Sequence, residues 1–143
     1  MRPQLIVLDT SGLLAYLDKS EARHDAVTRA IEADPGPFLL SPFVLAEVDS
    51  LLLSSSGVTA ELLFLKDVAG GSYRIESFGL DDVESATQLI ADYDDLGIGL
   101  ADASIVVIAA RAATTRILTL DEPHFRAIRP LRGRSFTLLP ADA

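Results

Sequence analysis

The sequence predicts an α/β domain of three layers, in which helices cover both faces of a mainly parallel sheet of about five short strands. Short apolar runs of strand length alternate along the chain with longer segments whose apolar residues recur at helical spacing. Turn-forming Gly, Pro, Ser and Asp residues separate these segments. The chain has 143 residues, of which 49% are apolar, and this length predicts one domain over residues 1–143.

The beginning of the chain is predicted to form a strand, two helices and a second strand. A strand at Leu5–Leu8 precedes apolar residues at helical spacing up to Leu17, and a second helix is expected from about residue 21 to residue 32. The sequence DPGP at 34–37 then breaks the chain before a strand at Phe38–Leu40.

Two helices and a third strand are predicted next. Ser41 and Pro42 begin the first of these helices, because Pro is tolerated at the first helical position. The sequence SSSG at 54–57 is expected to link it to another helix, which ends near the glycines at 70–71. The third strand is predicted at Tyr73–Ile75.

The last part of the chain is predicted to add two helices and two strands. Asp81 begins a helix that ends near Asp94, since acidic residues in a first turn suit the helix dipole. A helix from about 101 to 112 is apolar on every side and should be buried. Strands are predicted at Ile117–Leu120 and Phe136–Leu139, with a short EPHF turn between them.

The charge of the chain is unevenly distributed. A formal net charge of −9 argues against a protein that holds nucleic acid by bulk charge. Residues 1–110 carry 18 acidic and 6 basic side chains, whereas residues 111–134 carry 6 arginines and only 2 acidic side chains. The sequence therefore predicts an acidic protein with a basic segment close to its C-terminus.

The composition also restricts the cellular location. There is no cysteine, so disulfides and thiolate metal sites are excluded, and a reducing cytoplasm is expected. The longest apolar stretches, such as Ile105–Ala110, fall far short of the roughly 20 residues that a membrane span needs. Asp9 interrupts the first apolar run too early for a secretory signal. We expect a cytoplasmic protein with no membrane partner.

Four acidic residues stand out by their positions. Asp9 follows the first predicted strand, and Asp121 is predicted to close the fourth. Ligands of open parallel sheets bind outside the carboxyl ends of the strands, where both side chains would point. Asp102 lies in the first turn of the most apolar helix, and a helical projection places Glu47 on the apolar side of its own helix.

Each of these acids has a simpler interpretation when it is taken singly. Asp9 and Asp121 are good helix N-caps, and Asp102 suits a helix N-terminus. Glu47 is harder to explain, because a carboxylate on an apolar face is costly unless something pairs with it. Clustered carboxylates repel one another, so a shared site for four of them indicates a bound cation.

The donor types indicate which cation this would be. A site of carboxylates, without Cys and with only two His in the chain, favours a hard ion, Mg²⁺ or Mn²⁺, over zinc. Such an ion can activate a bound water and neutralise charge while a phosphodiester is attacked. The hydroxyls of Thr10, Ser11 and Thr119 are expected to orient the metal-bound carboxylates.

Four motifs of the chain together resemble those of a known family. They are LDTSGLLAYLD, the glutamate in SPFVLAEV, IGLADASIV and ILTLDEPHF. In this order and spacing they resemble the motifs of PIN-domain ribonucleases, most closely the VapC-type toxins of bacterial toxin–antitoxin pairs. The likeness covers essentially the whole chain. Each motif alone is a weak indication, whereas the ordered set is a strong one.

The resemblance implies a three-layer α/β/α PIN fold and cleavage of RNA that depends on Mg²⁺ or Mn²⁺. It also implies a small cognate antitoxin of the VapB type and a homodimer. By motif match Asp9, Glu47 and Asp102 are the core metal ligands, and Asp121 is the fourth acid. Asp95 lies where similar toxins often carry an acidic residue, so it is an accessory candidate, although a solvated helix end explains it equally well.

Two further features remain open at the level of sequence. The C-terminal arginines are candidates for contact with RNA or with the antitoxin, or they are simply solvated; the candidates are Arg111, Arg116, Arg126 and Arg129. His124 follows Asp121 closely and either assists proton transfer or is a structural residue of its turn. Transfer RNA and ribosomal RNA loops are both plausible substrates.

Two alternatives to a metal-dependent ribonuclease toxin remain. A PIN-like module that binds a partner protein without hydrolysing anything would have the same fold, but here all the expected carboxylates are present. A phosphatase with Asp9 as its nucleophile would need a second aspartate two residues later, where this chain has Ser11.

Overall fold

The computed structural model describes residues 4–143. Its strands are β1 (Ile6–Leu8), β2 (Phe38–Leu40), β3 (Arg74–Ile75), β4 (Arg116–Leu118) and β5 (Thr137–Leu139). The α-helices are α1 (Thr10–Leu17), α2 (His24–Glu32), α3 (Pro42–Ser56), α4 (Val58–Ala69), α5 (Leu80–Asp92), α6 (Leu100–Arg111) and α7 (Glu122–Ala127). One 3₁₀-helix, η1 (Asp94–Leu96), joins α5 to α6.

The five strands form one sheet in the order β3-β2-β1-β4-β5, and every pairing in it is parallel. Ile6 pairs with Phe38 on one side and with Arg116 on the other, so β1 is the central strand. Parallel neighbours require a crossover between them, and the helices provide it. The prediction of a parallel sheet of about five strands is confirmed.

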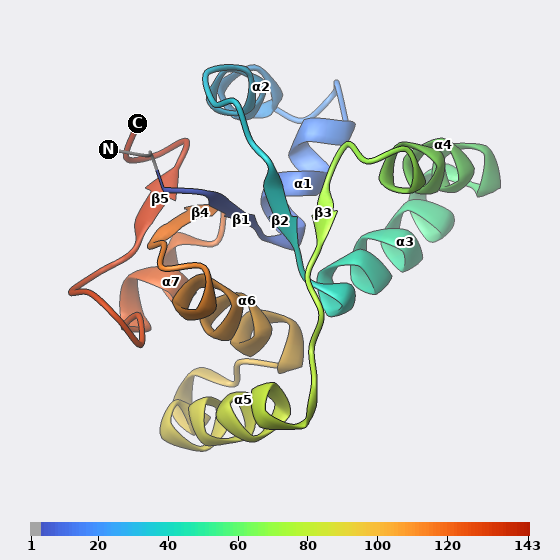
Figure 1. Cartoon of the computed structure of the whole chain (residues 1–143). Helices are drawn as coiled ribbons and strands as arrows, with labels where there is room; N and C mark the ends of the chain where they lie inside the picture. The colour runs from blue at the N-terminus through green and yellow to red at the C-terminus, as the bar shows by residue number, and fades with distance from the viewer. Residues whose placement is uncertain (1–3) are drawn as a thin grey trace.

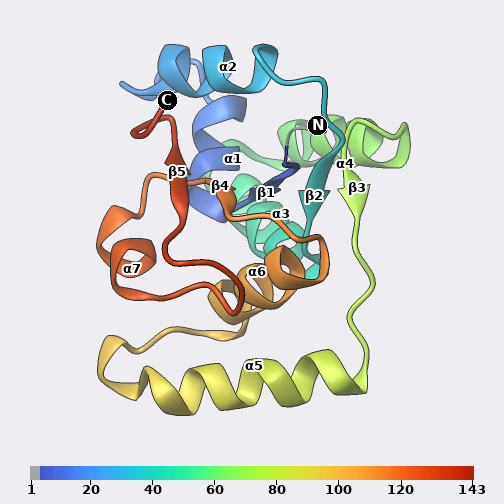
Figure 2. The same ribbon diagram turned by 60° about the vertical axis from the view of Figure 1, so that its left-hand side comes forward.

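Helices lie on both sides of this sheet, as three layers require. Figures 1 and 2 show α1 and α2 above the sheet and α5 and α6 below it, with α3 and α4 beyond the β3 edge in Figure 1. The strands β1, β2 and β4 are short, and nearly all of their side chains are buried, as is typical of a sheet covered on both faces. The apolar helix α6 is buried from Ala103 to Ala109, as predicted.

A glycine allows α1 to pack closely against the sheet. A Cβ added to Gly12 would lie 2.5 Å from the carbonyl oxygen of Leu118, at the end of β4. Real Cβ atoms do not approach an oxygen so closely, so only glycine fits here. This contact brings the first turn of α1 against the end of β4, which Thr119 and Asp121 of the predicted site follow in the chain.

The structure corrects three of the predicted elements. The serines at 54–56 belong to α3 and are not a linker, because Ser54 and Ser55 donate their hydroxyls to the Leu51 carbonyl within the helix. The EPHF sequence begins the short helix α7 and is not a turn. The fourth strand ends at Leu118, so Asp121 does not close it; the chain turns first, and Asp121 is the N-cap of α7.

Candidate active site

Four carboxylates that are far apart in the sequence line one cavity of about 450 Å³. Asp9 follows β1, Glu47 belongs to α3, Asp102 lies in the first turn of α6, and Asp121 precedes α7. Parallel strands have their carboxyl ends at the same edge of the sheet, so the cavity lies where ligands of such folds bind. The structure thus brings the four predicted acids together around one space.

Asp9 is the most enclosed of these acids, with 5% of its surface exposed. The hydroxyl of Thr119 donates to its Oδ2 over 2.6 Å, and the hydroxyl of Ser11 donates to the same oxygen over 2.9 Å. Asp9 occupies the N-cap position of α1, but its side chain makes no capping hydrogen bond. Its carboxylate is therefore oriented by two hydroxyls and is not engaged in ending the helix.

The same two hydroxyls hold the turn between β4 and α7. Ser11 Oγ accepts the backbone N–H of Leu120 over 2.9 Å, and Thr119 Oγ1 accepts that of Asp121 over the same distance. Asp121 Oδ1 in turn accepts the backbone N–H of His124, so this acid caps α7 as its simpler interpretation required. The network fixes Asp9 and the Asp121 backbone relative to each other.

The environment of the cavity raises the pKa of two acids. Burial raises the pKa of Asp9, and the negative charge of Asp121 adds to the effect, while the bonds from Thr119 and Ser11 oppose it. The pKa of Asp102 is raised to about 6, first by burial and then by the charge of Asp9. Ionisation of these carboxyls thus carries an energetic cost that a nearby cation would relieve.

Glu47 lies at the cavity but not in the buried position that the sequence predicted. The buried stripe of α3 consists of Val44, Val48 and Leu52, and Glu47 is exposed beside it. The helix is apolar well beyond its buried stripe, and Leu51 remains 42% exposed, so an apolar neighbourhood in projection did not mean burial. The argument that Glu47 needs a partner because it is buried is therefore wrong.

His124 is a further residue of the cavity, and the sequence left its role open. Its Nδ1 lies 3.0 Å from Asp121 Oδ2 and 3.7 Å from Asp102 Oδ2. The closer contact lacks hydrogen-bond geometry. The helical geometry of α7 explains the placement, because three residues after Asp121 the side chain returns to the same face.

The remaining candidates differ in how close they lie to the cavity. Thr10 lines it, and its Oγ1 is buried without a hydrogen-bond partner within residues 4–143. Asp95 lies in η1, is exposed and is not among the residues that line the cavity. Thr10 thus lies at the cavity with its hydroxyl buried, whereas Asp95 stands apart from the cavity.

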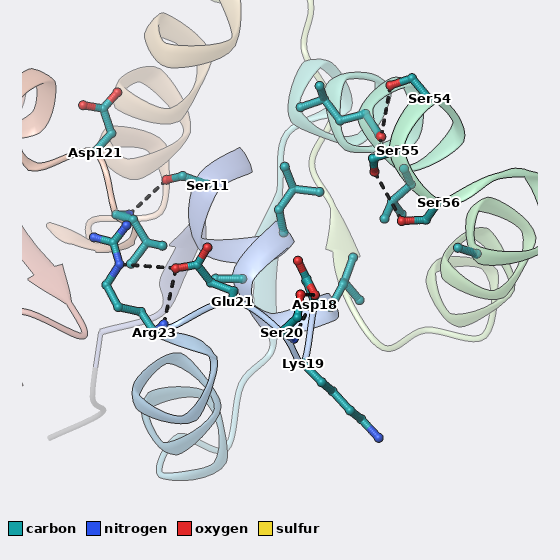
Figure 3. Close-up of a pocket in the computed structure, with 17 residues that line it drawn as sticks. Ser11, Asp18, Lys19, Ser20, Glu21, Arg23, Ser54, Ser55, Ser56 and Asp121 are labelled. Atoms are coloured by element: carbon teal, nitrogen blue, oxygen red, sulfur yellow. Dashed lines mark hydrogen bonds and ion pairs between the residues drawn. The ribbon is translucent and has the colours of Figure 1, made fainter.

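A larger groove of about 1000 Å³ continues from the carboxylate cavity. The two spaces share Ser11, Leu14, Leu51 and Asp121. Figure 3 shows the serines 54–56 of α3 on one side of the groove and Glu21 and Arg23 on the other, with Asp121 at one end. A chain molecule bound at the carboxylates therefore has a neighbouring groove into which it can extend.

The donor set of the cavity fits a hard divalent cation. Its ligand atoms are carboxylate and hydroxyl oxygens, together with one imidazole, and the Thr10 hydroxyl lacks a partner. Within the described part of the chain, no three Asp, Glu or His side chains are already arranged to hold one ion. Mg²⁺ commonly keeps several waters and binds through one or two carboxylates, so it does not need a closed cage.

Comparisons with known proteins agree with this fold. The family model described as "PIN domain" matches residues 6–129. The chain is 43% identical over 135 residues to Ribonuclease VapC26 of Mycobacterium tuberculosis. The aligned residues cover 94% of this chain and 100% of that protein. The parallel sheet covered by helices on both faces defines an α/β protein, and the chain belongs to the PIN domain family.

Two solved structures share the fold. The crystal structure of M. tuberculosis VapC20, described as a Sarcin-Ricin loop cleaving toxin, matches with a TM-score of 0.75 at 23% identity, over 81% of this chain and 89% of that one. A toxin–antitoxin complex from Klebsiella pneumoniae matches with a TM-score of 0.67 at 21% identity, over 86% of this chain and 92% of that one. Within residues 4–143, none of the helices has both the length and the apolar character that a membrane span needs.

Proposed function

We propose that this chain is an endoribonuclease that depends on Mg²⁺ or Mn²⁺ and acts as the toxin of a toxin–antitoxin pair. The observation that carries the proposal is the convergence of Asp9, Glu47, Asp102 and Asp121 on one cavity. The raised pKa values of Asp9 and Asp102 support it, because they reflect first burial of the carboxyls and then neighbouring negative charge, and a cation would offset both. The 43% identity to a protein named a ribonuclease supports the RNA substrate class.

The four carboxylates would hold the metal. When bound, such an ion supplies an activated water and neutralises charge on the attacked phosphodiester. The protein orients Asp9 through the Ser11 and Thr119 hydroxyls, which both bind Oδ2 and leave Oδ1 available. Thr10 also lines the cavity, and its buried hydroxyl has no hydrogen-bond partner among residues 4–143.

Cleavage of RNA with and without Mg²⁺ or Mn²⁺ tests the chemistry. We expect cleavage by the wild type with metal, none after chelation, and loss of at least about a hundredfold in Asp9→Asn and Asp102→Asn, which keep the side-chain shape. Asp25→Asn is the matched control, because Asp25 is an exposed acid of α2 away from the cavity. Full activity in the two site variants would contradict the proposed mechanism.

Metal binding is measured separately by calorimetry with Mn²⁺. We expect binding by the wild type and by Asp25→Asn, and strongly weakened binding by Asp102→Asn. Asp95→Asn tests the accessory residue in the same way; because Asp95 lies apart from the cavity, we expect wild-type affinity. Absence of Mn²⁺ binding that depends on these carboxylates would favour the alternative of a silent PIN-like module that binds a partner protein.

The RNA target and the protein partners are further parts of the proposal. Loops of transfer RNA and of ribosomal RNA are the two candidate substrates, and mapping the cleavage sites on total RNA distinguishes them. The fold shared with a toxin–antitoxin complex supports a small antitoxin of the VapB type. We expect the product of a neighbouring antitoxin gene to co-purify with this chain and to block its RNA cleavage; cleavage unaffected by that product would contradict the pairing.

A homodimer is also proposed. Several large apolar side chains of the helical layers are exposed, including Leu62 at 59%, Leu63 at 62% and Leu80 at 90%. Leu62 and Leu63 lie side by side in sequence on α4, and Leu80 begins α5. Large exposed apolar side chains that form a contiguous patch are typical of surfaces that a partner covers. Light scattering on the purified chain should give twice the mass of 15.3 kDa; a monomer at all concentrations would contradict the dimer.

A further inference from the structure

We propose that the segment between α7 and β5, residues 128–136, is a phosphate-binding loop that holds RNA outside the carboxylate cavity through Arg129, Arg132 and Arg134. This inference rests on the proposed ribonuclease function and adds a substrate-positioning site to it. The segment forms the left-hand margin of the molecule in Figure 1, between α7 and β5. It is called the arginine loop below.

Three of the six C-terminal arginines are already engaged within the protein. Arg111 donates to the Ser77 carbonyl over 2.6 Å and lies 3.2 Å from Asp82. Arg116 is 2.8 Å from Asp34. Arg126 donates to Asp142 over 2.6 Å and to Glu122 over 3.2 Å. The guanidinium groups of these three predicted contact residues are thus paired with carboxylates of the protein itself, which leaves little uncompensated charge for a ligand.

The three arginines of the loop are different. Arg129, Arg132 and Arg134 are exposed, and within residues 4–143 none of their guanidinium groups lies within ion-pair distance of an acidic side chain. The sequence analysis named Arg129 as a contact candidate but not Arg132 or Arg134. The difference between the paired arginines and the three arginines of the loop is visible only in the structure, which shows the carboxylate partners of the paired ones.

The loop is anchored at several points, so its arginines are displayed on a fixed backbone. Ile128 and Phe136, at its two ends, are 2% and 4% exposed. The backbone N–H of Arg129 donates to the Tyr93 hydroxyl over 3.0 Å. Anchoring of this kind reduces the entropy that would be lost when the arginines bind phosphates.

The charge of the rest of the protein explains why such a loop is needed. The chain carries a net charge of −9, and the cavity that must receive a phosphodiester is lined by four acids. A bound cation compensates only the phosphate next to it, whereas the other phosphates of an RNA remain repelled. Unpaired arginines outside the cavity supply an attraction for these other phosphates, and the guanidinium fork matches a phosphate in shape.

The position of the loop connects it to the site. It continues directly from α7, the six-residue helix that begins after Asp121 and carries His124. At about 1.5 Å per residue this helix is roughly 9 Å long, and Arg129 follows shortly after it. Arg132 and Arg134 flank Gly133, which lies beside Thr115 at the amino end of β4, so an RNA must extend around the sheet from its carboxyl edge to reach them. A folded RNA that places one phosphate at the carboxylates can therefore place others at the loop.

Binding of RNA as a function of salt tests this inference. Bulk ribosomal RNA and bulk transfer RNA serve as probes, with a chelator present so that neither is cleaved. For the double variant Arg132→Gln/Arg134→Gln we expect weaker binding and a salt slope reduced by about 1.4, since each single-strand phosphate contact contributes about 0.7. Arg74→Gln is the matched control: it removes the same charge from an exposed arginine that is paired with Glu76 at 3.1 Å, and it should leave the slope unchanged.

Cleavage kinetics provide the second measurement, on whichever of the two RNAs the wild type cleaves. We expect the double variant to raise KM several-fold with less than a twofold change in kcat, because the loop positions the substrate and does not touch the reacting atoms. Circular dichroism and thermal unfolding check that the exposed substitutions leave the fold intact.

The outcomes separate this inference from the proposed function. An unchanged salt slope and KM in a folded double variant overturns the arginine loop while ribonuclease activity stands. A loss of antitoxin binding with unchanged RNA binding also overturns it and assigns the loop to the protein partner. If the wild type binds RNA with the loop-dependent slope but never cleaves it, the loop stands and the nuclease assignment fails.

Discussion

Replacing Asp102 by asparagine should make the metal-free protein more stable while it destroys the site. Burial and the charge of Asp9 raise the pKa of Asp102 from 3.8 to about 6. The folded state therefore holds the Asp102 proton more tightly than the unfolded chain does, so ionisation at neutral pH destabilises the fold. Asparagine has nearly the same shape but carries no charge, and it removes this cost.

The expected magnitude follows from the shift. A difference of about two pKa units corresponds to about 3 kcal/mol as an upper limit, since each unit is about 1.4 kcal/mol. The Asp102 side chain is 23% exposed, and solvent screening reduces the effect. We expect a stabilisation of about 1–2 kcal/mol, which for a chain of this size is a rise of about 3–8 °C in Tm.

The pH dependence of this gain has a definite sign. Because the folded-state pKa of Asp102 is raised, the destabilisation is complete above about pH 6 and disappears as the pH falls below 3.8. The difference in Tm between the Asp102→Asn variant and the wild type should therefore be largest at about pH 8. The two Tm values should become equal at about pH 4. This is opposite to the behaviour of a carboxylate in a stabilising ion pair.

Thermal unfolding with a chelator present measures the gain, and addition of Mg²⁺ gives the complementary result. Mg²⁺ should raise the Tm of the wild type, because it binds only the folded state, and should narrow the difference from the variant. Asp25→Asn, at an exposed position, should change neither the Tm with chelator nor the increase in Tm that Mg²⁺ causes. A variant that is less stable than the wild type at alkaline pH, or a gain that persists at acid pH, would refute the account of clustered, repelling carboxylates.

Three further predictions concern the scaffold of the site. Thr119→Val removes the shorter hydrogen bond to Asp9 and should weaken Mn²⁺ affinity about 10–100-fold in calorimetry, with the far-ultraviolet circular dichroism unchanged; wild-type affinity would show that this hydroxyl does not orient Asp9. Gly12→Ala forces a Cβ against the Leu118 carbonyl and should lower the free energy of unfolding by about 1–3 kcal/mol in urea titration, whereas Gly79→Ala, with open space at its Cβ, should be tolerated. Ser104→Ala breaks the buried 2.6 Å bond between the Ser41 and Ser104 hydroxyls and should cost about 1 kcal/mol in the same titration, and a neutral result would mean that this bond does not join α3 to α6.

Most of the fold could be predicted from local patterns. The strand at Phe38–Leu40 has the predicted bounds, and the buried helix α6 begins and ends within one residue of the expectation. Strong periodicity and clear flanking residues make such segments legible in one sequence. The sequence predicts a turn where the structure has α7, because six residues are too few to show a helical period. The signal that indicates a helix there is a capping Asp121 followed by a Pro in the first turn.

The candidate site could be predicted in its residue types but not in its environment. The positions of Asp9, Asp102 and Asp121 near strand and helix ends indicated a common edge of the sheet, and the structure places them at one cavity. The exposure of Glu47 could not be predicted, because a projection of one helix does not show which of its apolar sides another element covers. The contact of His124 with two acids likewise depends on how α7 packs.

The sequence by itself determined the order of strands and helices and the identity of the acids, because both depend on residue types at short spacing. The tertiary structure alone decided which atoms meet across the chain. It places Ser11 and Thr119 on one oxygen of Asp9, and it leaves the arginines of the loop without the carboxylate partners that Arg116 and its neighbours have. The pairings of Thr119 with Asp9 and of Arg116 with Asp34 join residues 110 and 82 positions apart, so they depend on how the layers pack, and no local pattern encodes that geometry.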